Sequence, residues 1–143
     1  MAEKLQWDYV FSCDPIPQQI PKFNKLSKYY ENMHAGKLTT TQCTKCGKTT
    51  WPPRSVCPVC MSDEMAWIDL PEEGTIVVIS IQDGGAFPGF VAPLIFAMLK
   101  FGDVSFMAKI IDVDRAQLAP GKKVRFKPEV QYDGRILPAF TLV

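Results

Sequence analysis

The sequence has only one histidine, His34, among its 143 residues, and it carries almost no net charge. Its 16 lysines and arginines offset 15 aspartates and glutamates, so the formal net charge is +1. Domains that bind nucleic acid through bulk charge are usually strongly basic, so this balance argues against that function. The chain also lacks any run of 18 apolar residues, which argues against a transmembrane helix.

The residue sets of a self-contained enzyme are missing as well. There is no Gly-x-Ser-x-Gly motif, no phosphate-binding loop and no pair of carboxylates on a common strand, so we expect no complete catalytic site. The first residues lack the apolar run of a secretory signal, and we therefore expect a cytoplasmic protein. Apolar residues nevertheless make up 47% of the chain, enough to support a folded core.

Prolines and the spacing of apolar residues divide the first 36 residues into an arm and a helix. Pro15, Pro17 and Pro21 predict an extended arm over residues 1–21, because each proline disfavours helix at the residue before it. The arm carries four apolar side chains that we expect to cover a surface of this chain or of a partner: Trp7, Tyr9, Val10 and Phe11.

Residues 22–36 have helical spacing. Four apolar residues form one predicted stripe: Phe23, Leu26, Tyr30 and Met33. Gly36 is placed to end this helix. His34 lies near its C-terminal end, where we expect a surface or capping role.

The second half of the chain has the pattern of a β-barrel. We predict five strands over 75–81, 94–101, 104–111, 122–128 and 136–143. Residues 112–121 form a connection that has room for one helical turn. These strands fit a Greek-key barrel of the OB type, with an SH3-like barrel as the nearest competitor. The predicted fold is therefore mainly β, with an N-terminal arm and helix (1–36), a ribbon (37–70) and a five-stranded OB-fold barrel (74–143).

Four of the five cysteines form two Cys-x-x-Cys knuckles. They are Cys43 with Cys46 and Cys57 with Cys60, and ten residues separate the two knuckles. This spacing is typical of a rubredoxin-like zinc ribbon, in which four thiolates enclose a structural Zn²⁺ and leave no open position for substrate. Disulfides or free thiols are the alternative that the spacing disfavours, while iron in place of zinc would indicate a rubredoxin-like electron carrier. Cys13 lies outside this set, and we expect it to be a small buried side chain.

Several motifs around the ribbon resemble one known family. They are Gly36-Lys37-Leu38, the two knuckles with Pro52-Pro53-Arg54 before the second, and, in the barrel half, Gly74-Thr75-Ile76 and Leu137-Pro138-Ala139. With these motifs the chain resembles the zinc-ribbon plus OB-fold family labelled domain of unknown function 35, from about residue 22 onward.

The resemblance implies that the chain is the small, non-catalytic partner of a thiolase-fold protein that acts on acyl-CoA. Members of this family accompany acetoacetyl-CoA thiolases, steroid side-chain aldolases and the thiolase that cleaves benzoylsuccinyl-CoA in anaerobic toluene degradation. The last of these, the benzoylsuccinyl-CoA thiolase, is the kind of partner that we expect. Its catalytic residues would belong to the large subunit, and a CoA thioester would be the substrate of the complex.

Two groups of residues are candidates for contact with acyl-CoA or with the partner. The loop at 83–93 offers Phe87, Pro88 and Phe90 at a position that helps to form the ligand face of OB folds. Packing of this loop over its own barrel end remains the alternative. The basic residues Arg54, Lys122, Lys123 and Arg125 could steer CoA phosphates, although each could also be part of a solvated face. The same features would suit nucleic-acid binding in an OB groove, which the overall charge disfavours.

Overall fold

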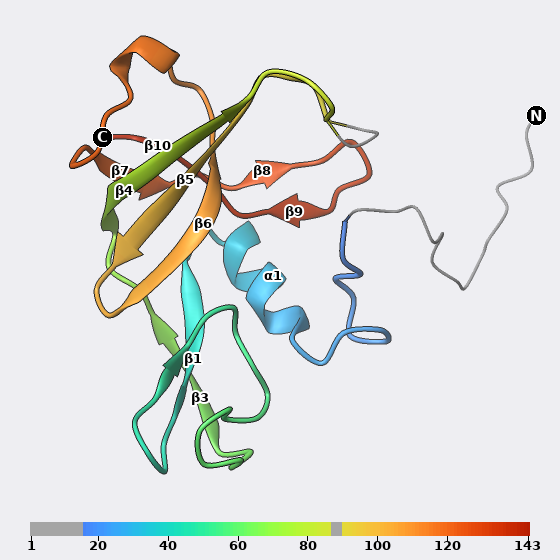
Figure 1. The fold of residues 1–143 in the computed structure, drawn as a ribbon. Helices are drawn as coiled ribbons and strands as arrows, with labels where there is room; N and C mark the ends of the chain where they lie inside the picture. Colours follow the sequence, from blue (N-terminus) through green and yellow to red (C-terminus); the bar gives the residue numbers. More distant parts are fainter. Residues whose placement is uncertain (1–15, 87–89) are drawn as a thin grey trace, which may run out of the picture.

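Figure 1 shows a computed structural model of the chain, which describes residues 16–86 and 90–143. A β-barrel forms the upper part of the molecule, and a small sheet lies below it. The helix α1 (Ser27–His34) lies between the two. The predictions for Cys13, for Trp7, Tyr9, Val10 and Phe11, and for Phe87 and Pro88 fall outside the described residues. No helix in the two described ranges is long and apolar enough to cross a membrane.

The lower sheet is antiparallel and carries the predicted ribbon. Its strand order is β2-β1-β3, with β1 (Thr39–Cys43) in the centre between β2 (Thr49–Thr50) and β3 (Met65–Asp69). β1 and β3 pair along their full length, from Thr39 opposite Asp69 to Cys43 opposite Met65. This pairing holds β1 in place, and β1 ends at Cys43, the first cysteine of the first knuckle.

The upper part is a closed barrel of five strands in the order β10-β6-β5-β4-β7. The strands β4 (Glu73–Gln82), β5 (Leu94–Phe101) and β6 (Val104–Ile110) follow one another, and β7 (Lys123–Phe126) returns to lie beside β4. This is the Greek-key order. β10 (Ala139–Leu142) closes the barrel, antiparallel to β7 and parallel to β6. The predicted mainly β fold, with a ribbon followed by a five-stranded barrel of the OB type, is confirmed.

Alternation along the strands fills the barrel with apolar side chains. β6 alternates buried and more exposed residues, and β7 buries Val124 between the exposed Lys123 and Arg125, as the sequence predicts. The largest buried side chains of the barrel include Ile76, Leu99, Phe101 and Phe140, each no more than 1% exposed. These side chains form part of the close-packed core of the barrel.

Three connections between strands of the described barrel have defined local structure. The hairpin between β5 and β6 turns at Gly102, whose φ is +57°. The connection after β6 contains a short 3₁₀ turn, Arg115–Gln117, and the Asp114 carboxylate accepts a hydrogen bond from the Ala116 amide at its start. Between β7 and β10 a separate hairpin pairs β8 (Glu129–Val130) with β9 (Ile136–Leu137).

The structure corrects the predicted helix in two ways. The α-helix begins at Ser27 and not near residue 22, because the Asn24 side chain accepts a hydrogen bond from the Leu26 amide and holds a turn there. Its buried face consists of Tyr29 and Met33, whereas Phe23 in the preceding turn is 46% exposed. The helix ends as predicted, with Gly36 at φ +76° just beyond it.

Two strand predictions also need correction. The run of Ile and Val in the predicted strand 75–81 is typical of a buried strand, but Val77 and Val78 in β4 are 47% and 59% exposed. A register shift between Ile76 and Val78 causes this, since a bulge turns consecutive side chains away from the regular alternation. The predicted strand 136–143 is interrupted at Pro138 and divides into β9 and β10.

Candidate functional site

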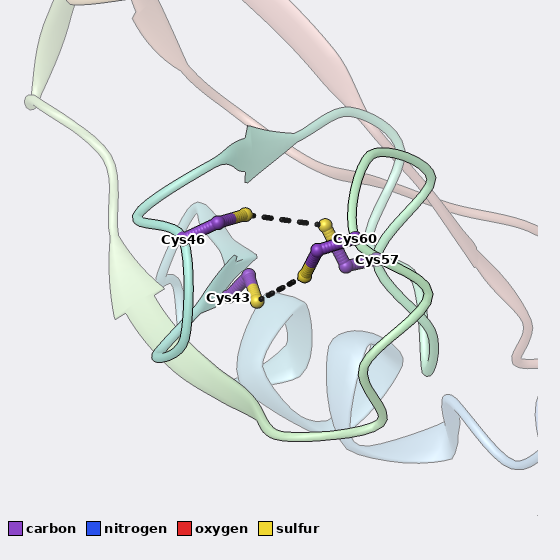
Figure 2. A group of neighbouring side chains, drawn as sticks. All are labelled: Cys43, Cys46, Cys57 and Cys60. Atoms are coloured by element: carbon purple, nitrogen blue, oxygen red, sulfur yellow. Dashed lines mark hydrogen bonds between the residues drawn. The ribbon is translucent and has the colours of Figure 1, made fainter.

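The four knuckle cysteines converge on one point between the ribbon loops. Figure 2 shows their side chains pointing toward one another from two separate turns. The Cys43 and Cys60 sulfurs are 3.6 Å apart, as are those of Cys46 and Cys57, and all four sulfurs lie within 4.8 Å of one another. The group combines buried residues, Cys43 and Cys57, with the exposed Cys46.

These distances suit a tetrahedral metal ion. A Zn–S bond of about 2.3 Å places neighbouring sulfurs about 3.8 Å apart in a tetrahedron. The same distances are far too long for a disulfide bond of about 2.05 Å, so these four cysteines form no disulfide. The donor set therefore fits a closed Zn²⁺ site, whose role would be to fold and stiffen the ribbon.

The two knuckles have the same backbone pattern. In the first, the Cys43 amide donates to the Lys48 carbonyl and the Gly47 amide donates to the Cys43 carbonyl, each at 2.9 Å. In the second, Cys57 donates to Ser62 at 2.8 Å and Met61 donates to Cys57 at 3.1 Å. The residue after each second cysteine has a positive φ, +73° at Gly47 and +60° at Met61. Glycine adopts such a φ without steric cost, so Gly47 suits the position after the first knuckle.

Backbone amides donate hydrogen bonds that lower the pKa of two of the four cysteines, Cys43 and Cys57. Hydrogen bonds from the amides of Cys60 and Val59 lower the pKa of Cys57 to about 6. The Val59 amide, for example, lies 3.4 Å from the Cys57 sulfur. The amide of Cys46 likewise lowers the pKa of Cys43. Thiolates are the form that binds zinc, so these amides favour the metal-binding state at Cys43 and Cys57. At Cys46 the Lys48 amide also lowers the pKa, but desolvation and the three neighbouring cysteine side chains together raise it to about 12.

The predicted basic residues do not line one common surface hollow. Arg54 lines a hollow between ribbon and barrel, together with Asp103 and Ser105. Lys122 and Lys123 line another beside Leu118. Arg125 lines a third near Leu70 and Glu72, although it follows Lys123 on the same exposed face of β7.

A larger hollow lies on the β5–β6 side of the barrel, and we call it the barrel hollow. It has a volume of about 570 Å³. Its walls include Phe90, Leu94, Phe96, Met107, Leu137 and Pro138, with Lys109 as the charged residue. The loop after β4 and the segment before β10 thus meet at one site, as the corresponding loops do at the ligand face of OB folds.

Sequence reasoning found only part of this hollow. Phe90, a residue predicted to contact acyl-CoA or the partner, lines this hollow, whereas Phe96, Met107 and Lys109 were not among the predicted residues. Apolar residues at outward-facing positions of β5 and β6 were the sequence signal for this hollow. Met107, for example, lies between the buried Phe106 and Ala108 and is itself 66% exposed. A single exposed apolar side chain is ordinary, but its continuity with the other apolar residues of the hollow marks a candidate binding surface.

Lys109 is held in place within the barrel hollow. Its ammonium group forms an ion pair with Glu129 at 2.7 Å and lies 5.7 Å from the centre of the Phe90 ring. The pair is only partly exposed, with side-chain exposures of 20% and 30%. The hollow is therefore an apolar surface with one neutralised charge, suited to apolar and aromatic groups rather than to a bare anion.

The fold and the cysteine site define a rubredoxin-like zinc ribbon carried by an OB-type barrel. Residues 35–66 match the family model described as "ChsH2, rubredoxin-like zinc ribbon domain". This match and the cysteine geometry together support structural zinc binding. A comparison with curated proteins found no match.

Two solved structures share the fold. One, titled "Ltp2-ChsH2(DUF35) aldolase", is 17% identical with a TM-score of 0.70, covering 81% of this chain and 92% of the other. The second is a protein of unknown function from the DUF35 family of Sulfolobus solfataricus, 15% identical with a TM-score of 0.56 and covering 81% and 83%. These findings support the resemblance to the family labelled domain of unknown function 35.

Proposed function

We propose that the chain is a zinc-binding, non-catalytic accessory subunit of a cytoplasmic complex that contains a thiolase-type large subunit. On this proposal the chain belongs to the family labelled domain of unknown function 35. The complex makes or breaks a carbon–carbon bond in an acyl-CoA. A thiolase of the kind that cleaves benzoylsuccinyl-CoA is the first large subunit to test, following the resemblance of the motifs.

One observation carries the proposal: the ribbon matches the ChsH2 family model, and the described fold resembles a chain whose title places ChsH2 with an aldolase. The structural likeness covers 92% of that chain, so it includes the barrel as well as the ribbon. A subunit that shares this whole architecture is a reasonable candidate for a similar place in a complex.

The structure suggests how the parts would work in such a complex. Cys43, Cys46, Cys57 and Cys60 would hold Zn²⁺ and keep the ribbon rigid. The barrel hollow would receive an apolar part of the partner or of the acyl group, with Phe90 in contact. Arg54, Lys122, Lys123 and Arg125 would act from separate places, by attracting the CoA phosphates or acidic groups of the partner.

We further propose that the arm with the helix (1–36), the ribbon (37–70) and the barrel (74–143) are the functional units of the chain. The ribbon and the barrel hollow are then two distinct surfaces. Changes in each can be tested separately for their effect on assembly.

Co-purification tests the proposal. The chain is expressed with a thiolase-fold protein encoded next to it, and the affinity tag is placed on the large subunit. We expect both chains to elute together at a fixed ratio. The variant Phe96→Ser in the barrel hollow should weaken recovery, while Val143→Ser, an exposed residue outside the hollow, should not. Elution of the large subunit alone, with this chain left in the flow-through under mild salt, would contradict the proposal.

A further inference from the structure

We propose that the ribbon is a redox modification site. Hydrogen peroxide would convert Cys46 and Cys57, and then Cys43 and Cys60, into two disulfides that link the knuckles and release the metal. The inference concerns the zinc-loaded chain itself and does not depend on the proposed function.

The first observation is that the sulfurs form two pairs across the knuckles. Cys46 lies 3.6 Å from Cys57, and Cys43 lies 3.6 Å from Cys60, as the dashed lines in Figure 2 show. The partners are 11 residues apart in the first pair and 17 in the second, and the first pair is nested inside the second. Both disulfides can therefore form in one chain without exchanging partners.

The second observation is that each pair combines an accessible sulfur with a buried one. Cys46 is exposed and Cys60 is partly exposed, whereas Cys43 and Cys57 are no more than 1% exposed. An oxidant in solution therefore meets Cys46 first. The buried Cys57 is shielded from the oxidant and is placed to attack the Cys46 sulfur once that sulfur has been oxidised.

The surroundings of Cys46 suit this reaction. Lys45 and Lys48 flank it in the sequence, and reactive cysteines are typically found in exposed, electropositive places. A thiol that coordinates zinc is deprotonated. Cys46 is therefore a thiolate in the zinc-loaded chain, although desolvation and the other three cysteines outweigh the Lys48 amide and raise the pKa of its free thiol.

The chemistry needs one peroxide for each disulfide. The Cys46 thiolate attacks one oxygen of hydrogen peroxide, the O–O bond breaks, and hydroxide leaves a sulfenic acid on Cys46. The Cys57 thiolate then attacks the Cys46 sulfur, so that the S–S bond forms, the S–O bond breaks and a second hydroxide leaves. The two sulfurs together lose the two electrons that the peroxide gains. A second peroxide oxidises Cys60 and Cys43 in the same way.

Loss of the metal follows from the first disulfide. A closed zinc site needs four ligands, and only Cys43 and Cys60 then remain. The disulfides close the same connections between the knuckles that the metal closes, so we expect the oxidised ribbon to keep its fold. Reduction by a thiol would restore the four ligands.

Peptide mapping of the zinc-loaded full chain tests the proposal. The Cys13→Ser variant is used, so that only the knuckle cysteines can form disulfides, and one equivalent of hydrogen peroxide is added before free thiols are alkylated. Trypsin separates Cys43, Cys46 and the second knuckle into three peptides, because basic residues lie between them. We expect the Cys46 peptide to be linked to the second-knuckle peptide, with fragmentation placing the bond at Cys57, while Cys43 is recovered as an alkylated thiol.

A chromogenic chelator and thermal unfolding provide further readouts. Zinc should be released in proportion to the Cys46–Cys57 bond. After two equivalents of peroxide, the zinc-free oxidised chain should keep an unfolding transition of the ribbon that the reduced, chelated chain loses. A first disulfide within a knuckle, Cys43 with Cys46 or Cys57 with Cys60, would overturn the proposal. Peroxide that leaves zinc bound, or that takes Cys46 to a sulfinic acid without any disulfide, would overturn it as well.

Discussion

The Trp51 ring, from the loop between the two knuckles, stacks on Phe106 of the barrel strand β6. The ring centroids are 3.9 Å apart and the ring planes differ by 16°. Trp51 also meets Tyr29 of the helix edge-on, with centroids 6.1 Å apart. It packs against both hydrophobic clusters, the barrel core and the smaller cluster of Tyr29, Met33 and Ile136. The ribbon is thus joined to the barrel by a shared aromatic contact.

A double-mutant cycle should detect this contact. Trp51→Leu and Phe106→Leu each remove one ring, and the pair should show a coupling free energy of about 0.5–1.5 kcal/mol beyond the loss of buried area. Denaturant unfolding of the zinc-loaded chain gives the four free energies. Coupling within error of zero would mean that the ribbon and barrel are energetically independent.

Gly74 should be intolerant of any side chain, because of packing rather than backbone conformation. A Cβ at this position would lie 2.3 Å from Cε2 of Phe101, a ring that is fully buried. We expect Gly74→Ala to destabilise the chain by about 1–3 kcal/mol through overpacking. Gly84→Ala is the matched control, because nothing lies within 4 Å of its Cβ and its φ is not positive. Equal thermal stability of the two variants would contradict this packing explanation.

Local patterns made the metal site predictable from sequence. The spacing of Cys43, Cys46, Cys57 and Cys60 determines which sulfurs can meet, and alternation such as Lys123-Val124-Arg125 reveals a half-buried strand. Both signals lie within a few residues of the chain, where backbone geometry alone relates the side chains.

Features that depend on distant contacts were not predictable. The helix starts late because of one Asn24 side chain, and Val78 is exposed because of a bulge in register with β5. The barrel hollow combines residues from β5, β6 and the segment before β10, which only the closed barrel brings together. Arg54 and Arg125 are both basic, but the fold places them at different hollows.

Substitutions at the residue that follows each knuckle should have different effects on stability: Gly47→Ala adds a side chain, and Met61→Gly removes one. Gly47→Ala places a side chain at φ +73° with no clash nearby, so its cost should be the backbone strain of about 1 kcal/mol. Met61→Gly relieves the same strain at φ +60° and loses little packing, since Met61 is 74% exposed. We therefore expect Met61→Gly to be neutral or slightly stabilising. Thermal unfolding of both zinc-loaded variants checks this, and a clear loss for Met61→Gly would show that its side chain has a packing role.

Zinc retention should depend on pH in a defined direction. The pKa of Cys57 is lowered from an ordinary value of 9.0 to about 6, so its thiolate is favoured in the folded chain. The resulting stabilisation is fully present above pH 9 and is lost as the pH falls through about 6. Because protons compete with the metal for the thiolates, we expect zinc to be retained at neutral and mildly alkaline pH and to be released progressively as the pH falls, as followed with a chromogenic chelator.

Cys57→Ser is the control for that titration, because a neutral hydroxyl replaces the thiolate. The variant should fail to retain zinc even at pH 8, and the ribbon should lose its structure with the metal. Metal analysis of the wild-type chain should find one zinc per chain in a colourless protein. A red protein that contains iron would instead favour the electron-carrier interpretation.

The most direct measurement of the accessory-subunit proposal is the activity of the large subunit with and without this chain. A purified thiolase-fold partner is assayed for CoA-dependent cleavage of its acyl-CoA substrate while the zinc-loaded chain is added in increasing amounts. The account predicts that activity rises and saturates at a fixed ratio of the two chains, and that the chain alone has none. A large subunit that is fully active and stable by itself, and unchanged by the added chain, would contradict it.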